Sequence, residues 1–435
     1  MATSLPRRRF IQASAATALL ATLAACGGSK DHSSDAPASP QSAEFEGTGP
    51  ITWVQGKDFS GGKVQARLDE WNKENPGEEV TLIELSSEAD QQRQSLVNNA
   101  QTNSDAYDVI SLDNVWVAEF AANQWVMPLP AEELKNNDII DAVYNTGVYR
   151  DVLYGMPFAT DAPMMYYRKD LLEQAGVKVP TTWDEVKTAI DAVRKLPGHE
   201  NIGGFGGQWA KYEGLTCNIS EFIHTCGGGF YNDKGDVIIN SPESIKGLQT
   251  AMDGFKDGII PQAALEWKEE DGRNAFESDQ LLFYRQWPYE YGSDLEALGV
   301  EKFGVAPLPS INGNAYVPTL GGHNCAISKD CKNKATALKF IQWWTSKESE
   351  EYALKEQSLA PILGELYTEE ENVQQFPYLP VLKDSLDDAK GRPRVVNYGD
   401  VTAAIQDAIY PAIKGETTAE EAIKDLESKL KAVSA

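Results

Sequence analysis

The residue patterns that would mark an enzyme or a metal site are missing from the sequence. It contains no HExxH zinc motif, no P-loop and no GxSxG nucleophile elbow. The four histidines, His32, His199, His224 and His323, have no spacing that suggests a shared metal ion. The acidic segment 232–236 lacks the spacing of a calcium loop and is typical of a hairpin turn. We therefore expect neither a cofactor nor a bound metal.

One carboxylate lies where open α/β proteins bind their ligands. Apolar runs at 51–54, 80–83 and 109–112 alternate with helical segments, and this βαβαβ order predicts a parallel sheet with right-handed crossovers. Ligands of such sheets bind beyond the carboxyl ends of the strands. Asp113 directly follows the third run, so it is a candidate ligand-binding residue. The alternative is that its side chain caps the following helix.

The charge balance limits the partners of this chain. The 435 residues include 42% hydrophobic and 24% charged side chains, as in ordinary globular proteins, and the length predicts two or three domains. Lys and Arg number 39 against 65 Asp and Glu, which gives a formal net charge of −26. Since nucleic acids and anionic lipids repel such a surface, we expect the chain to bind neither of them by charge.

Residues 1–25 have the features of an export signal. Three arginines at positions 7–9 precede a run of small and apolar residues at 13–25, which is too short to span a membrane. The arginines resemble a twin-arginine signal, with general secretion as the alternative route. The string Leu-Ala-Ala-Cys at 23–26, followed by Gly27, resembles a bacterial lipobox.

The lipobox predicts a membrane tether. Cleavage before Cys26 and lipidation of its thiol would hold the chain at the outer face of the bacterial cytoplasmic membrane, whereas the alternative is a soluble secreted protein. Residues 26–49 are rich in Gly, Ser, Pro and Asp, which predicts a lipid-anchored flexible linker. We expect the folded body to begin near Pro50.

Four further cysteines lie in the body, at Cys217, Cys226, Cys325 and Cys331. An exported chain meets an oxidising environment, so one or two disulfides are plausible, and four cysteines allow three full pairings. A continuous helix would place Cys217 and Cys226 on opposite faces, roughly 10 Å or more apart. Their pairing requires that the helix end before Cys226, and the sequence leaves the pairing open.

Several strings along residues 50–435 resemble one protein family. They are Tyr-Asp-Val-Ile-Ser-Leu-Asp at 107–113, Pro-Phe at 157–158, Tyr-Tyr-Arg-Lys-Asp-Leu-Leu at 166–172, Thr-Trp at 182–183, Tyr-Glu-Gly-Leu at 212–215 and Leu-Gly-Gly-His-Asn at 320–324. On these strings the body resembles the extracellular solute-binding proteins of bacterial ABC importers. The resemblance is to the carbohydrate group, which includes maltose-binding and trehalose/maltose-binding proteins.

The resemblance implies an α/β fold with two hinge-linked, discontinuous lobes and a ligand cleft between them, the type II periplasmic-binding-protein-like fold. The first lobe would comprise residues 50–155 and 304–346, and the second residues 156–303 and 347–435. Such a protein, expected to be a monomer without catalytic activity, would capture an α-linked disaccharide or oligosaccharide of trehalose or maltose type. Hinge closure would then present the sugar to the transmembrane subunits of an ABC permease.

The resemblance also assigns ligand-binding residues. Sugar hydroxyls suit carboxylates and guanidinium groups, and sugar C–H faces suit aromatic rings. The matching positions are Asp113, Asp161, Trp287, Tyr289, Gly321, Gly322, His323, Arg394, Ser87 and Gln55. Relatives often have Trp where this chain has His323. The alternatives are Arg392 for Arg394, Ser86 for Ser87 and Lys57 for Gln55. Each assigned residue also has a purely structural alternative, such as a turn, core packing or a surface ion pair.

Two other functions fit the same sequence. An exported lipoprotein glycosidase would need two carboxylates about 5–10 Å apart, and Asp113 and Asp161 are the first pair to consider. The same fold would also bind a different solute, such as a polyol or a glycerol phosphodiester. A strongly cationic cleft would favour the phosphodiester.

Overall fold

The computed structural model describes residues 45–136, 138–232 and 234–434. The predicted export signal, Cys26 and most of the predicted linker lie outside the described residues. Within those ranges, no helix has both the length and the apolar run that crossing a bilayer requires.

The first sheet confirms the predicted βαβαβ order. Parallel pairing joins β1 (Ile51–Gln55) to β2 (Val80–Glu84) and to β3 (Val109–Asp113), and the crossovers are α1 (Lys63–Glu74) and α2 (Ala89–Gln101). The order in the sheet is β12 (Lys390–Gly391), β11 (Thr319–Ile327), β3, β1 and β2, and β6 (Met156–Asp161) pairs with β11. β11 lies between β3 and β6 and pairs antiparallel with both of them, so distant parts of the chain share one sheet.

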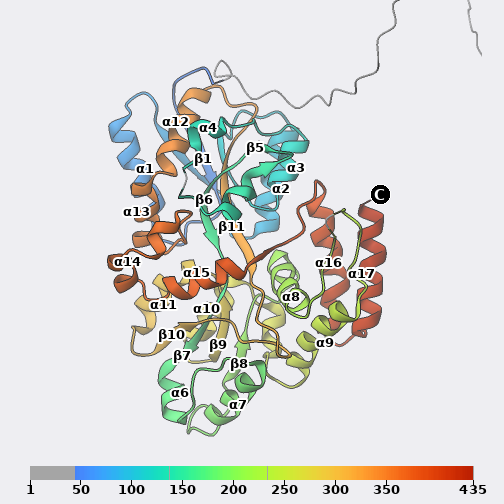
Figure 1. Cartoon of the computed structure of the whole chain (residues 1–435). Helices are drawn as coiled ribbons and strands as arrows, with labels where there is room; N and C mark the ends of the chain where they lie inside the picture. Colours follow the sequence, from blue (N-terminus) through green and yellow to red (C-terminus); the bar gives the residue numbers. More distant parts are fainter. Residues whose placement is uncertain (1–44, 137, 233, 435) are drawn as a thin grey trace, which may run out of the picture. The chain divides into compact units, whose positions relative to one another are not determined.

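The second sheet has four strands. Their order is β10 (Phe303–Ala306), β7 (Met164–Arg168), β9 (Leu281–Gln286) and β8 (Gly203–Gly206). Figure 1 shows β7, β8 and β9 in the opposite half of the described structure from β1, β6 and β11. The two-lobed α/β fold expected from the sequence is therefore confirmed.

The other helices are α3 (Val117–Ala122), α4 (Ala131–Leu134), α5 (Asp141–Tyr144), α6 (Lys169–Ala175), α7 (Trp183–Val193), α8 (Glu213–Thr225), α9 (Pro242–Lys256), α10 (Glu269–Glu277), α11 (Tyr291–Leu298), α12 (Lys334–Trp344), α13 (Lys347–Gln357), α14 (Glu370–Gln375), α15 (Leu379–Asp388), α16 (Tyr398–Ile413) and α17 (Ala419–Val433). A short hairpin joins β4 (Val148–Tyr149) to β5 (Val152–Leu153). Tyr231 pairs antiparallel with Val237, as the turn predicted between them requires, and Asp233 within this segment lies outside the described residues.

Two strands differ from the expected lobe boundaries. β6 lies in the first sheet although residues from 156 onward were expected in the second lobe. Pro163, which has no amide hydrogen for a strand ladder, separates β6 from β7, so the chain changes sheets after Asp161. β10 pairs with β7 in the second sheet although residues 304–346 were expected in the first lobe.

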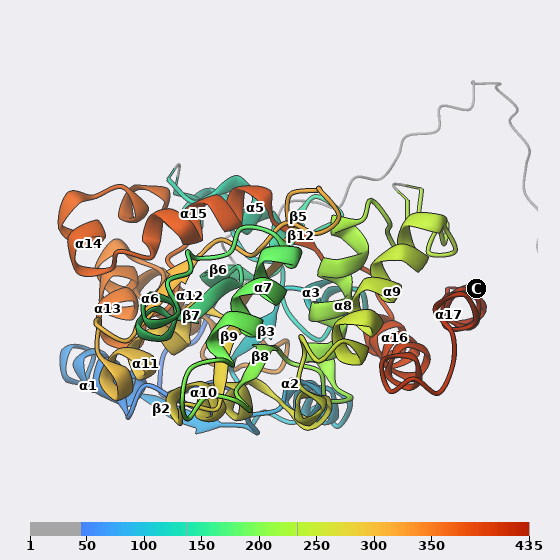
Figure 2. The same ribbon diagram turned by 90° about the horizontal axis from the view of Figure 1, so that it is seen from below.

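The C-terminal segment also divides between the lobes. Ile362, Leu363 and Leu366 pack in the first-lobe core with Trp53 and Phe340, although residues 347–435 were expected in the second lobe. In contrast, α16 and α17 pack against α8 and α9 of the second lobe, and both views show these four helices side by side (Figures 1 and 2).

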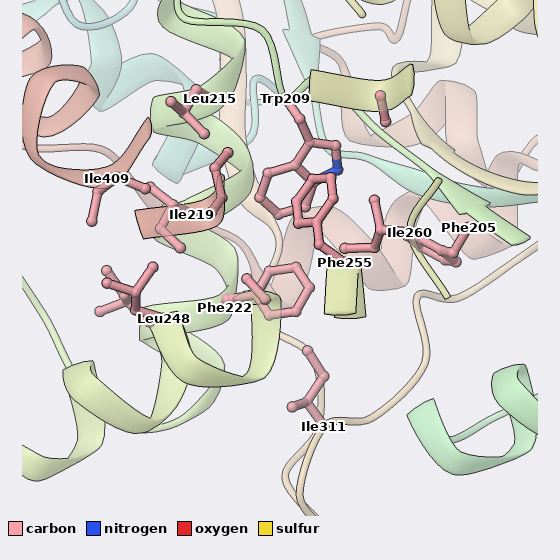
Figure 3. Packing of buried hydrophobic residues seen from close by; sticks show 14 of the residues in the cluster. Phe205, Trp209, Leu215, Ile219, Phe222, Leu248, Phe255, Ile260, Ile311 and Ile409 are labelled. Carbon is pink, nitrogen blue, oxygen red and sulfur yellow. The ribbon is translucent and has the colours of Figure 1, made fainter. Parts of the chain in front are cut away.

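The second-lobe core is built around aromatic side chains. Phe222 on α8 is 2% exposed, and its ring lies 5.7 Å from that of Trp183 and 5.7 Å from that of Trp209. Figure 3 shows Phe222 among Trp209, Phe255 and aliphatic side chains of neighbouring segments. Burial of these rings provides the hydrophobic free energy that holds α8 in the second-lobe core.

The four described cysteines are free and buried, so the suggested disulfides are not formed in this structure. Helix α8 ends at Thr225, and Cys226 follows as its C-cap with helical dihedral angles, so the helical path from Cys217 continues up to Cys226. Burial raises the pKa of the Cys217 thiol, which keeps it in the unreactive protonated form.

We expect Phe222→Ala to lower the free energy of unfolding by about 3–5 kcal/mol, because the substitution leaves a cavity among packed aromatic rings. Val300→Ala is the control, since Val300 is 56% exposed and should change stability little. Urea denaturation followed by circular dichroism measures both. Equal, small losses in the two variants would contradict the described core.

Candidate functional site

A cleft of about 700 Å³ lies between the two lobes. On the first-lobe side it is lined by the segments after β1 and β2 and by the end of β3. On the second-lobe side it is lined by the starts of α8 and α10 and by the segment after β9. Its volume is within the range of small-molecule sites, and the carboxyl ends of three parallel strands meet it, as the sequence predicted.

A buried arginine joins the two lobes in this cleft. Arg392, which follows β12, is 4% exposed, and its Nη2 donates to Asp113 Oδ1 at 2.7 Å. Its Nη1 donates to Glu213 Oε1 at 2.6 Å. Asp113 is the last residue of β3 and Glu213 the first of α8, so one guanidinium group connects carboxylates of both lobes. Such charge-assisted bonds fix the direction of both carboxylates.

Both carboxylates have further partners. Asp113 Oδ1 accepts from the amide of Val115 at 3.2 Å, but the N-cap of α3 is Trp116 and has no side-chain cap bond, so the capping role considered for Asp113 is not found. Glu213 Oε2 accepts from Thr402 Oγ1 at 2.7 Å, and Glu213 Oε1 accepts from the Tyr398 hydroxyl. Burial raises the pKa of Glu213 to about 7; the positive charge of Arg392 opposes this shift and Asp113 adds to it.

Asp161, the last residue of β6, offers a free acceptor in the cleft. Its Oδ1 is buried and has no hydrogen-bond partner among the described residues. Burial raises the pKa of Asp161 to about 7, the charge of Asp113 adds to the shift, and Arg285 and Arg392 oppose it. A ligand hydroxyl that bonded this atom would remove the cost of leaving a buried polar atom without a partner.

Two glycines allow the backbone to approach the site closely. A Cβ atom on Gly321 would lie 2.9 Å from Cβ of Asp161 and 3.2 Å from the Trp287 ring. Gly322 has a φ of +112°, where side chains are strained, and its Cβ would lie 2.6 Å from the carbonyl oxygen of Ala159. Glycine at 321 therefore leaves room for Asp161 and Trp287 beside β11, and glycine at 322 lets β11 approach the backbone of β6.

Trp287 and Tyr289 present aromatic rings to the cleft. The Arg285 guanidinium carbon lies 3.9 Å from the Trp287 ring centroid, and Arg285 is itself buried and paired with Glu221 at 2.5 Å. The Tyr289 hydroxyl donates to Glu270 Oε1 at 3.3 Å. These partners hold both rings in place, which suits stacking against the flat C–H face of a ligand.

Nine of the ten predicted site residues line this cleft. They are Asp113, Asp161, Trp287, Tyr289, Gly321, Gly322, His323, Ser87 and Gln55. Arg394 does not line it, because its Nη2 donates to the carbonyl oxygens of Val148 at 2.6 Å and Thr146 at 3.4 Å. Arg392 takes the position in the cleft that Arg394 was expected to occupy. The binding role of each residue stays a prediction.

His323 lies beside the central carboxylate. It is opposite Asp113 in the β3–β11 ladder, so the two side chains project from the same face of the sheet. Burial lowers the pKa of His323, which favours the neutral imidazole as a hydrogen-bonding group.

Sequence reasoning missed several residues of the cleft. Glu213, Phe59, Glu88 and Lys268 line it, and none was assigned a role. The string Tyr-Glu-Gly at 212–214 belongs to the strings that resemble the family, which was the available signal for Glu213. For the other three, no local pattern distinguishes them from ordinary surface residues.

The cleft contains more acidic than basic groups. Ten Asp or Glu side chains line it, against five Lys or Arg. In the described part of the chain, no group of three or more His, Cys, Asp or Glu residues is arranged to hold a metal ion. Carboxylates and a guanidinium group beside aromatic rings can bind a neutral polyhydroxylated ligand, whereas an anion would meet a net repulsive lining.

A family model described as bacterial extracellular solute-binding protein matches residues 60–351. The chain is also 29% identical over 375 residues to a probable ABC transporter-binding protein of Deinococcus radiodurans, covering 83% of this chain and 88% of that protein.

Solved structures share the fold. Maltose-bound MalE3 of T. maritima is 30% identical, with a TM-score of 0.83, covering 88% of this chain and 99% of the other. A solute-binding protein of Thermotoga lettingae bound with alpha-D-tagatose is 23% identical, with a TM-score of 0.80, covering 90% of this chain and 100% of that chain.

We expect Asp161→Asn to stabilise the protein increasingly as the pH rises from about 5 to 8. The folded protein keeps the Asp161 proton up to a pKa of about 7, whereas the unfolded chain releases it at about 4. Rising pH therefore favours unfolding of the wild type through this group, and the amide removes that contribution.

Urea denaturation at several pH values measures the difference between variant and wild type. Asp191→Asn, on an exposed position of α7, is the control and should follow the wild-type profile. A constant difference between Asp161→Asn and wild type across this range would contradict a raised pKa.

Proposed function

Because the chain belongs to the bacterial extracellular solute-binding protein family, we propose that it captures an α-linked glucose disaccharide or short oligosaccharide for an ABC importer. One observation carries this proposal: Asp161, with a buried oxygen that lacks a partner, lies in the same cleft as Trp287 and the Arg392–Asp113 pair. Asp161 would bind a sugar hydroxyl and Trp287 the apolar face of a sugar ring. The Arg392–Asp113 pair supplies oriented polar groups.

The choice of an α-glucoside rests on similarity and on charge. Maltose-bound MalE3 of T. maritima, 30% identical to this chain, supports a maltose-like ligand, and the trehalose-like alternative rests on the resemblance of the sequence alone. The excess of acidic groups in the cleft favours a neutral ligand over a glycerol phosphodiester.

We also propose that the protein binds its sugar without cleaving it. Both oxygens of Asp113 accept from Arg392, at 2.7 Å and 3.3 Å, so this carboxylate is engaged and poorly suited to act as a nucleophile. Binding energy would instead go into closing the lobes, because contacts made by both walls exist only when the cleft is closed. The closed form would then be read by the transmembrane subunits of the permease.

Titration calorimetry against neutral saccharides tests the proposal. We expect maltose or trehalose to bind, and Trp287→Ala to weaken this binding by about 10- to 100-fold, since it removes an aromatic stacking surface. The melting temperature should change little, because Trp287 is only half-buried. Absence of binding to every neutral disaccharide and oligosaccharide, or release of glucose from the ligand, would contradict the proposed function.

The proposed location is the outer face of the cytoplasmic membrane, held by a lipid on Cys26. We expect Cys26→Ser to move the protein from the membrane fraction to the medium or the soluble extracellular fraction, because no thiol remains for lipidation. Fractionation followed by immunoblotting measures this, with Cys331→Ser, a buried cysteine of the body, as the control. Retention of Cys26→Ser at the membrane would contradict the lipid anchor.

A further inference from the structure

Two contacts connect the walls of the cleft through side chains that are partly exposed to solvent. Lys268 Nζ lies 2.5 Å from Glu88 Oε1, and the side chains are 37% and 31% exposed. Phe59 is 42% exposed and stacks on Tyr289, with ring centroids 6.4 Å apart and planes inclined by 22°. All four residues line the cleft, and we call them the rim contacts.

Each rim contact joins one lobe to the other. Phe59 follows β1 and Glu88 precedes α2, so both belong to the first lobe. Lys268 precedes α10 and Tyr289 follows β9, so both belong to the second lobe. The rim contacts therefore connect the two walls of the cleft at partly exposed positions.

Local partners hold the ion pair in position. Gln91 Nε2 donates to Glu88 Oε2 at 2.9 Å, which leaves Oε1 for Lys268. The Lys268 amide donates to Asp271 Oδ2 at 3.0 Å, and its ammonium group lies 5.8 Å from the Tyr212 ring centroid. Less side-chain freedom is lost on forming a pair whose members are already restrained.

We propose that the rim contacts select ligands by length. A saccharide short enough to lie beneath them leaves the Glu88–Lys268 pair and the Phe59–Tyr289 stack intact. A longer chain projects between the walls and must separate both contacts to remain bound. This inference rests on the proposed function, since it concerns saccharides bound in the same cleft.

The expected selectivity is modest. Exposed ion pairs stabilise by at most about 1 kcal/mol, so breaking this one costs about fivefold in affinity. The stack of a partly exposed aromatic pair adds a similar amount. The rim contacts should therefore bias the protein toward short ligands rather than exclude long ones, and salt should weaken the bias.

The test measures dissociation constants for linear α-glucosaccharides of two to seven units by calorimetry. We expect Lys268→Met and Glu88→Gln each to raise the affinity for the longest relative to the shortest ligand by about fivefold. The double variant should match either single variant, because both remove the same pair. Charge reversal, Glu88→Lys with Lys268→Glu, should restore the wild-type ratio.

A matched control separates the rim contacts from surface charge in general. The Lys187–Asp257 pair, at 3.1 Å, is similarly exposed but does not line the cleft. Lys187→Met with Asp257→Asn should leave the ratio of affinities for the longest and the shortest saccharide unchanged.

The outcomes distinguish this inference from the function on which it rests. Suppose that the wild type binds saccharides, but that the ratio of affinities for the longest and the shortest ligand is the same in the wild type and in the Glu88 and Lys268 variants. The length selection is then overturned and the proposed function stands. If the variants lose affinity equally for all lengths, Lys268 contacts the ligand directly and the length selection is again overturned. If the wild type binds no saccharide, the proposed function fails and the inference with it.

Discussion

The buried contact of Arg392 with Asp113 and Glu213 is the interaction on which the cleft depends. Its three charged groups come from the segment after β12, the end of β3 and the start of α8, so it fixes elements of both lobes relative to one another. Burial of charge is costly unless every group is paired, and removal of one partner leaves an uncompensated charge.

Sheet topology determines which side chains can meet at this point. The three parallel strands β1, β2 and β3 end on one side of the first sheet, and Asp113 is at that end. The antiparallel strand β11 brings Gly321 opposite Asp161 and His323 opposite Asp113. Residues more than 150 positions apart in the chain are thus neighbours because their strands share hydrogen bonds.

The electrostatic character of the cleft follows from burial as much as from composition. Asp161 and Glu213 have pKa values raised to about 7, because both carboxyl groups are removed from water near the charge of Asp113. Near neutral pH Asp161, whose Oδ1 has no partner among the described residues, is therefore partly protonated and can donate as well as accept a hydrogen bond. That capacity suits hydroxyl groups, which also do both.

The sequence by itself determined the local elements. Apolar runs and their spacing were sufficient for β1, β2 and β3, and the position of Asp113 after β3 made it a candidate because strand ends bind ligands. Resemblance to a known family added most of the other residues that line the cleft.

Tertiary structure decided the rest. Arg392 and Arg394 are two residues apart, but Pro393 separates them on non-strand backbone, so only the docking of β12 decides which one reaches Asp113. Likewise, the sequences of β6 and β10 are typical of strands but do not show which of the two sheets each strand joins. That depends on which sheet has a strand edge free to pair with it. Glu88 and Lys268 carry no local signal, because an ion pair across a cleft depends on the closeness of two lobes and not on sequence spacing.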